Sequence, residues 1–327
     1  MSMRKVVLLL STALALIVAA LAVPTASAAA APQAALPAAT QTKAVTYAPV
    51  TIPAAVEGGE HGHTGNVFSF GVEAPCKDCY ITKISPDLVY ADGSNANVDT
   101  GPMVHHFVMF NQNRQDPLCG GNMTNPSFFL GERFMAAGNE RTVLSSPEGY
   151  GYYVEPNARW NMIADYMSHA YEPKQVFVKI TWDFVPAAGS NLKKLQPLWL
   201  SIPECYPPDT YVVQPGRTTA TFNWRSSLSG KVVGTGGHLH NSGQNIKLSN
   251  ATTGQQMCDS QAKYGETPEY INIHGGKELS SMSVCVGSHG GVGEVKAGET
   301  LRIESTYDAK ETIPDAMGIV MVFLETQ

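Results

Sequence analysis

KQVFVKITWDFVPAAGSNLKKLQPLWLSI, residues 174–202, contains two β-type segments separated by Pro, Gly and Asn residues. Val, Ile, Thr, Phe and Trp are typical of strands, and Gly, Pro and Asn mark turns. Helical periodicity is hard to find, and similar short segments recur along the chain. They are NVFSFGVE, YITKISPDLVY, PMVHHFVMF, RWNMIADYM, TATFNWR, NIKLSN, LRIEST and MGIVMVFLE. We therefore expect an all-β protein made of antiparallel β-sandwiches of the jelly-roll type.

The N-terminus has the layout of a secretory signal peptide. Basic residues precede an apolar run, Val6–Val23, and small residues follow up to Ala28. We expect residues 1–28 to be removed on export and residues 29–45, rich in Ala, Pro, Gln and Thr, to be a disordered tail. No later run is long and apolar enough to span a membrane. The sequence thus predicts a secreted protein with no membrane span.

Chain length predicts two domains. The mature chain is long for one sandwich, and the irregular segment PECYPPDTYVVQPG, residues 203–216, falls midway. We expect an N-terminal jelly-roll domain at residues 46–200 and a C-terminal one at residues 201–327.

Net charge excludes one class of partner. The chain has 22 basic and 28 acidic residues, a net charge of −6, and loss of Arg4 and Lys5 makes it −8. An acidic protein of this kind is not expected to bind nucleic acid.

Cysteines in an exported chain favour disulfides. There are six of them: Cys76, Cys79, Cys119, Cys205, Cys258 and Cys285. The CKDC motif could also indicate a thioredoxin-type redox site, but no βαβ pattern surrounds it. Proximity in sequence favours pairing of the first with the second and of the fifth with the sixth, which leaves Cys119–Cys205.

GGHLHNSGQN, residues 236–245, carries two histidines one residue apart. In an extended segment His238 and His240 point to the same side while Leu239 points away. That arrangement suits a metal ion, and the preceding glycines let the backbone approach a site closely. The alternative is two surface histidines near a turn.

GPMVHHFVMF, residues 101–110, carries an adjacent pair, His105 and His106. Adjacent strand residues face opposite sides, so the two can share a metal only if the strand twists or bulges, or if the rings use different nitrogens. Both faces of the segment are apolar, and burying an unpartnered imidazole costs on the order of 2 kcal/mol or more. Something should therefore satisfy these rings, and hydrogen-bonded core histidines are the alternative to a metal.

Met317 stands at the start of the last apolar segment, just after a Pro-Asp turn. A methionine there is ordinarily core. Together with His238 and His240, its thioether would complete a soft ligand set that holds Cu(I) while the imidazoles also serve Cu(II).

The other histidines read as poor ligands. EHGHTG, with His61 and His63, is a glycine-rich polar stretch that we expect to be solvated, and His274 and His289 lie in predicted turns. No GxSxG motif occurs, and every cysteine is expected to be oxidised, so a serine or cysteine hydrolase is not indicated.

The order of these motifs resembles the copper type II, ascorbate-dependent monooxygenases, the group that contains peptidylglycine α-hydroxylating monooxygenase and dopamine β-monooxygenase. The resemblance covers roughly residues 60–325. It implies two jelly-roll domains facing each other across a solvent-filled gap. One copper, held by three histidines, passes electrons from ascorbate, and another, held by two histidines and a methionine, activates dioxygen to cleave a substrate C–H bond.

Position by position, the resemblance makes His238, His240 and Met317 the ligands of the oxygen-activating copper, and thus the catalytic residues. It makes His105 and His106 two ligands of the electron-transfer copper.

The third ligand of the electron-transfer copper departs from the family pattern. The matching stretch, MIADYMSHAYEP, aligns Asp165 with that histidine and places His169 four residues later. A carboxylate is a harder donor than imidazole and favours Cu(II). Either the potential of the site is shifted, or His169 reaches in, or this copper is bound poorly, so we expect one or two copper ions per chain.

Substrate residues depart as well. The peptide-amidating members bind a substrate carboxylate with an arginine, an asparagine and a tyrosine, where this chain has Gly236, Ile319 and Met321. A glycine-extended peptide is therefore disfavoured.

These features predict a secreted copper- and ascorbate-dependent monooxygenase that hydroxylates an unidentified small-molecule or peptide substrate. The alternative is a non-catalytic secreted copper-binding protein. A third reading, an adhesion or carbohydrate-binding module without metal, leaves the buried histidine pair unexplained.

Overall fold

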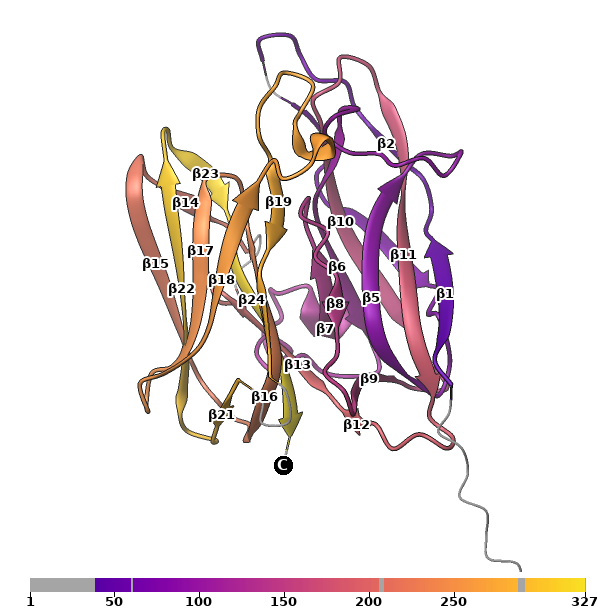
Figure 1. Ribbon diagram of the computed structural model, residues 1–327, viewed down its shortest axis with the longest axis vertical. Coiled ribbons are helices and arrows are strands. Elements are labelled where there is room, and N and C mark those ends of the chain that lie inside the picture. The colour runs from indigo at the N-terminus through magenta and orange to yellow at the C-terminus, as the bar shows by residue number, and fades with distance from the viewer. Residues whose placement is uncertain (1–38, 60, 206–208, 288–291, 327) are drawn as a thin grey trace, which may run out of the picture. The chain divides into compact units, whose positions relative to one another are not determined.

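The structure is a computed structural model that describes residues 39–59, 61–205, 209–287 and 292–326. The predicted signal peptide and His289 lie outside the described residues. The described chain is almost entirely β, which confirms the predicted fold class (Figure 1). Its helical elements are single turns, α1 (Ser127–Leu130) and the 3-10 turn η1 (Pro268–Tyr270). No described helix has the length and apolarity needed to cross a membrane.

Two sheets form the first sandwich, and their strands are antiparallel except for the short β12–β9 pair. One sheet follows the order β1-β11-β5-β9-β12, with β2 beside β11 and β8 beside β5. Its strands are β1 (Gln41–Thr46), β2 (Val50–Ile52), β5 (Cys79–Val89), β8 (Leu144–Ser145), β9 (Tyr150–Val154), β11 (Lys174–Pro186) and β12 (Lys193–Lys194).

The second sheet of this sandwich has the order β3-β10-β6-β7, with β4 beside β10. Its strands are β3 (Gly62–His63), β4 (Val67–Val72), β6 (Pro102–Asn111), β7 (Glu132–Ala137) and β10 (Trp160–Ser168).

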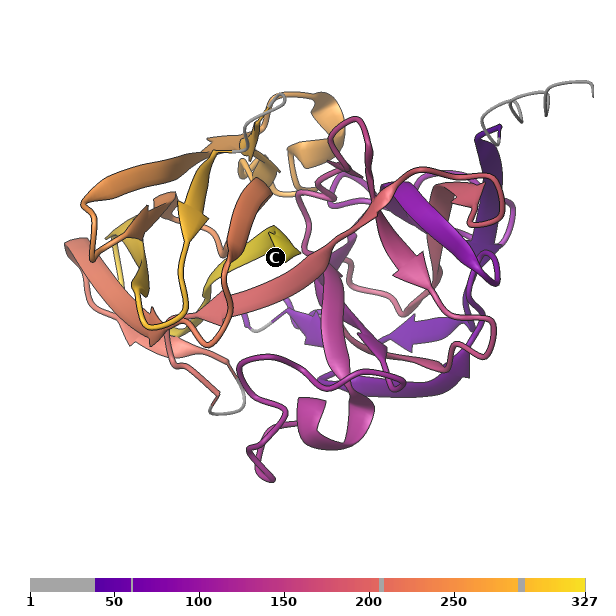
Figure 2. The same ribbon diagram turned by 90° about the horizontal axis from the view of Figure 1, so that it is seen from below.

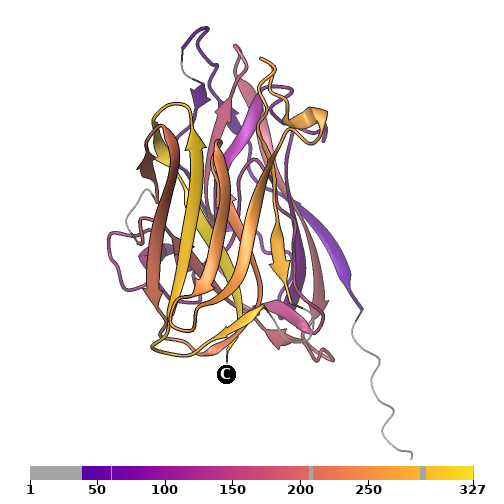
Figure 3. The same ribbon diagram turned by 60° about the vertical axis from the view of Figure 1, so that its left-hand side comes forward.

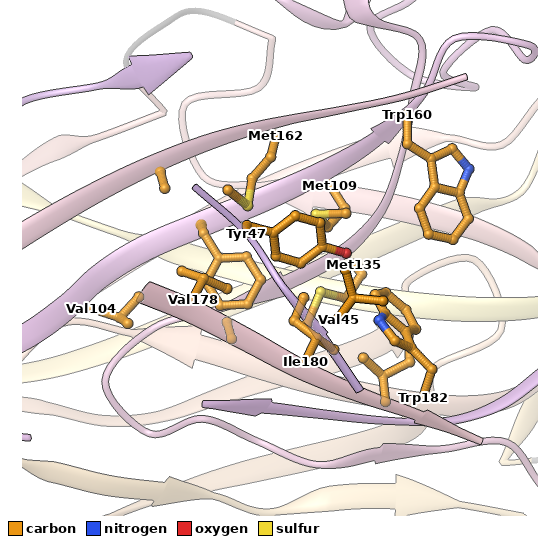
Figure 4. Close-up of a cluster of buried hydrophobic side chains, with 14 of the residues drawn as sticks. Val45, Tyr47, Val104, Met109, Met135, Trp160, Met162, Val178, Ile180 and Trp182 are labelled. Carbon is orange, nitrogen blue, oxygen red and sulfur yellow. The ribbon is translucent and has the colours of Figure 1, made fainter. Parts of the chain in front are cut away.

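Alternation along β11 shows why this sequence makes a sandwich. Val178, Ile180 and Trp182 are buried while the residues between them are only partly buried, as expected of a strand with one face in the core. Figure 4 shows these side chains packed with residues such as Met109 and Trp160 of the facing sheet.

The second sandwich also has two sheets. One has the order β13-β24-β16-β20, with β21 beside β16, and the other has the order β15-β22-β17-β18-β19 (Figure 3). The strands of the first are β13 (Gln196–Ser201), β16 (Gly230–Leu239), β20 (Val284–Val286), β21 (Gly293–Val295) and β24 (Gly318–Thr326). Those of the second are β15 (Gly216–Arg225), β17 (Gly243–Asn250), β18 (Gln255–Tyr264), β19 (Leu279–Met282) and β22 (Thr300–Ala309). A further pair consists of β14 (Tyr211–Val213) and β23 (Ile313–Ala316).

Two boundaries predicted from the sequence, the end of the disordered tail and the start of the second domain, need correction. The predicted disordered tail, residues 29–45, is wrong at its end, because Gln41–Thr46 pairs with β11 and buries Val45. Strand β13 pairs with β24, so it belongs with the second set of strands although it begins before residue 201. Figure 2 shows the two sets of strands, each with its own layers. The jelly-roll connectivity of each set stays a prediction.

The two sets share an apolar cluster. It is formed by Val108, Phe110, Leu130, Ile163, Trp199, Met317, Ile319 and Met321. A disulfide, Cys119–Cys205, also connects the first set to the segment before β14. The pairs Cys76–Cys79 and Cys258–Cys285 complete the predicted disulfide set, so all three pairings are confirmed.

Candidate metal centre

A β-bulge brings the adjacent histidines of β6 together. In the pairing of β6 with β10, Asp165 lies opposite His106 and Tyr166 lies opposite Val104, which leaves His105 as the extra residue. A bulge twists the strand locally and re-aims the side chains beside it. The ring centroids of His105 and His106 are 5.2 Å apart. The prediction that these residues can share a site only if the strand bulges is therefore consistent with the observed register.

Strand β16 needs no bulge at its histidines. His238 and Leu239 lie opposite Ile319 and Gly318 in regular register, and the irregularity of this strand lies earlier, between Val232 and Gly234. Leu239 is buried in the core, while the rings of His238 and His240 have centroids 5.5 Å apart. The prediction that the two imidazoles lie on one side is confirmed.

Two histidines of β6 and one that directly follows β16 converge. One ring nitrogen from each of His105, His106 and His240 lies within 4.8 Å of the other two. The centroids of His105 and His240 are only 4.4 Å apart. We call this group the histidine trio. The resemblance had assigned its members to two separate copper ions, whereas the structure brings them into one group.

Buried nitrogens at the trio lack hydrogen-bond partners. Within the described part of the chain, His106 Nδ1, His240 Nε2 and the nearby His238 Nε2 are buried and unpartnered. Buried polar atoms normally have a partner, and an imidazole nitrogen that lacks one can be satisfied by binding a metal ion. The residues present thus fit a metal ion.

Burial keeps these rings neutral. Burial, and then the neighbouring His105, lower the pKa of His106 to about 3. The same two causes hold the pKa of His240 well below its ordinary value. A neutral imidazole has a free lone pair, which is the form that binds metal.

Asp165 anchors His105. Its Oδ2 lies 2.7 Å from His63 Nε2 and 3.2 Å from His105 Nδ1, and its Oδ1 accepts a hydrogen bond from Thr64 Oγ1 at 3.3 Å. Burial alone would raise the pKa of Asp165, but hydrogen bonds from His105 and His63 bring it down to about 2. The ionised carboxylate orients the His105 ring and leaves Nε2 available to the trio.

Sequence reasoning missed the EHGHTG histidines. Both rings are exposed, but His63 contacts Asp165, and the ring of His61 lies 4.2 Å from that of His169. Both are exposed to solvent, as expected, but β3 pairs with the end of β10 and places them beside the site, a position that we did not predict from the sequence. The repeated HxH spacing was the signal that could have found them.

His169 lies away from the trio. Its ring is buried, its Nε2 is 3.4 Å from Glu278 Oε1, and it belongs to neither ligand group that the described residues form. His274 lies in an exposed turn, as expected, with its ring centroid 6.0 Å from that of His169. That His169 binds a metal stays a prediction.

Glu140 anchors His238. Its Oε1 lies 2.9 Å from His238 Nδ1, and both side chains are buried. Gly138 makes room for this contact, since a Cβ there would lie 2.4 Å from His238 Cε1 and 2.6 Å from Glu140 Oε2. Nothing in the local sequence indicates this pair, which joins residues 98 positions apart.

Tyr307 links two predicted copper ligands, His240 and Met317, through its hydroxyl group. Its hydroxyl accepts a hydrogen bond from the His240 backbone N–H at 2.8 Å and donates one to the Met317 carbonyl at 2.5 Å. Met317 is 3% exposed and belongs to the shared apolar cluster. The phenol thus fixes the backbone of His240 relative to that of Met317.

Two cavities of different size adjoin the trio. The larger one, of about 490 Å³, is lined by His105, His238, His240, acidic residues such as Glu140 and several apolar residues. A smaller one of about 80 Å³ is lined mainly by apolar residues of the shared cluster, together with His106, His238 and Met317. His238 lines both.

A buried cation borders the smaller cavity. Arg133 donates to Asp116 at 2.8 and 3.1 Å and to Asp209 at 3.4 Å, and its guanidinium lies over Trp199. No motif around Arg133 predicts a buried cation at this position. Because two carboxylates already engage Arg133, it is not free to bind a substrate carboxylate in the way that the peptide-amidating family requires.

Ile319 and Met321, which stand where the peptide-amidating family has an asparagine and a tyrosine, lie in the shared apolar cluster. A Cβ at Gly236 would lie 3.1 Å from Val284 Cγ1, so the strand packs closely at that position.

Comparisons with known proteins point to copper chemistry in relatives. A family model described as "Stress up-regulated Nod 19" matches residues 203–327. The chain is 23% identical over 271 residues to "Probable copper-dependent oxygenase M1" of Phoma sp., covering 77% of this chain and 65% of that protein. It is 22% identical over 261 residues to "Probable copper-dependent oxygenase clz3" of Cochliobolus lunatus, covering 74% of this chain and 78% of that protein. The chain thus spans just under two thirds of the first relative, and the names of the two relatives do not specify an ascorbate-dependent monooxygenase.

Among solved structures, the major capsid protein P2 of bacteriophage PM2 matches with a TM-score of 0.32 and 9% identity, over 80% of this chain and 98% of that one. Similarity at this level carries no argument about function.

Proposed function

We propose that this protein is a secreted copper-dependent oxygenase whose copper is held by the histidine trio. The observation that carries the proposal is the convergence of one nitrogen from each of His105, His106 and His240 within 4.8 Å. Imidazole nitrogens suit both oxidation states of copper. Bound copper would supply redox chemistry with dioxygen, and ascorbate is the reductant that the family resemblance indicates.

The surrounding residues are suited to hold such an ion. Asp165 accepts hydrogen bonds from His105 and His63, and Glu140 accepts one from His238, which fixes these rings and their tautomers. The low pKa values of His106 and His240 keep their rings neutral at physiological pH. The two relatives with copper-dependent oxygenase in their names support the choice of copper over other metals.

A monooxygenase reaction is the finer part of the proposal. His238, His240 and Met317 would hold the oxygen-activating copper of the family pattern, and His238 and Met317 line one small apolar cavity. An apolar wall excludes water beside the reacting centre and favours a small apolar substrate. Whether the chain holds one copper or two is part of the test.

Export is supported by the disulfides. All three pairs form between residues of the described chain, as expected in an oxidising compartment. Residues 1–28 would be the signal peptide.

The test combines copper content with ascorbate-driven oxygen consumption by the purified mature chain. We expect one or two copper ions per chain and ascorbate-dependent consumption that a candidate apolar substrate stimulates. His240→Ala should abolish both copper retention and consumption, while His274→Ala, an exposed control, should retain them. Retention of copper by His240→Ala at the wild-type level would contradict the trio as the site.

A non-catalytic copper-binding protein is the second candidate. One observation favours this candidate. His240, which the family pattern assigns to the oxygen-activating copper, lies in one group with His105 and His106, which the pattern assigns to the electron-transfer copper. Under this candidate the protein holds copper tightly but shows no substrate-dependent oxygen consumption with ascorbate. Met317→Ala helps to separate the candidates, because a thioether ligand should favour Cu(I) and its loss should weaken Cu(I) binding far more than Cu(II) binding.

A further inference from the structure

A second group of ligands lies beside the trio. One atom from each of His63, His105 and Asp165 lies within 4.8 Å of the other two. Asp165 Oδ2 is 2.7 Å from His63 Nε2 and 3.2 Å from His105 Nδ1. Two ligands of a tetrahedral zinc ion, each about 2.0–2.1 Å from the metal, lie roughly 3.3 Å apart. The atoms are thus close to the spacing of zinc ligands, and small shifts of the side chains would complete it.

The three residues stand on adjacent strands of one sheet. His63 is on β3, Asp165 on β10 and His105 on β6, and these strands are neighbours in the order β3-β10-β6. Thr64 Oγ1 holds the other oxygen of the carboxylate. Ligands on paired strands keep their separation better than ligands on loops.

The donor set differs in hardness from the trio. The trio offers only imidazoles, whereas this group adds an ionised carboxylate with a negative charge. We propose that His63, Asp165 and His105 form a second metal site that takes a divalent cation of the zinc type and shares His105 with the copper site. An N₂O set suits Zn²⁺ and does not suit Cu(I). The inference goes beyond the proposed function and does not require that copper be bound.

The site is open on one side. The side chains of Asp165 and His105 are 7% and 11% exposed, whereas that of His63 is 46% exposed. Solvent can therefore reach the His63 side and supply a fourth ligand, as in zinc sites with three protein ligands. All six cysteines are in disulfides, so no thiolate competes for the ion.

Sharing His105 is chemically consistent. Its Nδ1 faces Asp165, and its Nε2 remains for the trio. When both nitrogens bind metal, the ring is an imidazolate, and its single N–H proton is released to the buffer. Each metal then has its own nitrogen.

The test is calorimetric titration of Zn²⁺ into the metal-free mature chain that carries His240→Ala, which removes one ligand of the trio. We expect one equivalent of zinc to bind. Adding His63→Ala or Asp165→Asn should weaken that binding at least 100-fold, whereas adding the exposed control His274→Ala should leave it within twofold. Zinc binding that is unchanged by His63→Ala would overturn the proposal.

His63→Gln serves as a second variant. It keeps the size of the side chain and a hydrogen-bond donor toward Asp165, so it should fold with an unchanged melting temperature and still lose zinc. Retention of zinc by His63→Gln would also overturn the proposal. If the wild-type chain does not bind copper but zinc binding still depends on His63, the proposed function is overturned and the zinc site stands.

The shared ligand has its own readout. With Cu²⁺ loaded at both positions of the wild-type chain, an imidazolate bridge couples the two spins, and the paramagnetic resonance intensity should fall well below the copper content. In His63→Ala the remaining copper should give full intensity. Full intensity from two copper ions in the wild type would overturn the sharing of His105.

Discussion

Strand β6 and the end of strand β16 each supply two imidazoles to one place by different means. On β6 the histidines are adjacent in sequence, and they converge because His105 is the extra residue of a bulge. His238 lies on β16 in regular register, and His240 follows directly after the last residue of that strand, so the extended chain is enough. Spacing predicts which side of a strand a ligand takes only where the register is regular. Where it is irregular, the partner strand decides.

The two pairs are alike in their anchoring. In each pair one histidine contacts a buried carboxylate, His105 with Asp165 and His238 with Glu140. The other histidine of each pair, His106 or His240, keeps a buried nitrogen without a hydrogen-bond partner in the described chain. Each pair thus combines one ring that a carboxylate orients and one ring with a nitrogen that is free to bind a metal ion.

The largest effect is expected from the disulfide that connects the two strand sets. Cys119–Cys205 closes a loop of 86 residues, and loop-closure entropy predicts that its loss lowers the free energy of unfolding by about 4.6 kcal/mol. Cys258–Cys285 closes 27 residues within the second set, and the same relation predicts about 3.6 kcal/mol. Urea unfolding of the double Cys→Ser variants measures both, and a larger loss for the shorter loop would contradict the ranking.

Removal of a histidine whose free nitrogen would bind copper should have the next largest effect. His106→Ala and His240→Ala should each weaken copper binding by more than 100-fold, beyond the 10- to 100-fold that outer-shell changes cost. His238→Ala should weaken it less if the trio alone holds the ion. Competition with a chromogenic chelator measures all three. An equal loss in His238→Ala would show that the β16 pair, with Met317, is the stronger site.

Substitution of the carboxylates that orient the histidines should reduce copper affinity less than loss of His106 or His240. Asp165→Asn and Glu140→Gln keep the volume and remove the charge that orients His105 or His238. We expect a 10- to 100-fold loss of copper affinity or of oxygen consumption, with the fold retained. If only Asp165→Asn has an effect, the β16 pair does not contribute to the copper site.

Acid sensitivity of the metal-free chain should be the smallest effect. The pKa of His106 is about 3 in the folded state and about 6.5 when unfolded, so the unfolded chain binds more protons below pH 6.5. Stability is therefore fully present above pH 6.5 and falls as the pH drops, by about 1.4 kcal/mol for this residue between pH 7.5 and 5.5. Urea unfolding with a chelator should show a shallower fall in His106→Ala. An identical fall would mean that His106 is not the group responsible.

Much of the fold and part of the site follow from the sequence. The β-type segments and the two short-range disulfides were predicted correctly, because strand composition and proximity are local properties, and Cys119–Cys205 followed by elimination. The shared side of His238 and His240 was predicted for the same reason. The bulge at His105 could be stated only as a condition, since it depends on register against β10.

The remaining site contacts depend on pairing between segments far apart in the sequence, so local patterns do not predict them. His63 reaches Asp165 only because β3 pairs with the end of β10, about a hundred residues later. Glu140 and Tyr307 contact His238 and His240 from other strands or loops, and neither lies in a recognisable motif. Convergence of the trio depends on contact between the two strand sets, which no local pattern encodes.

The edge strand β1 sets a limit on proteolytic trimming of the chain. Residues Gln41–Thr46 form six pairs with β11, and β1 has no further neighbour in that sheet. Cleavage anywhere before Gln41 leaves this pairing intact. Cleavage after Thr46 would remove Val45 from the core and leave residues 179–184 of β11 without their partners on that side, while β2 stays paired to the start of β11. The six pairs of β1 therefore define how far the chain can be trimmed while this sheet keeps all its strands.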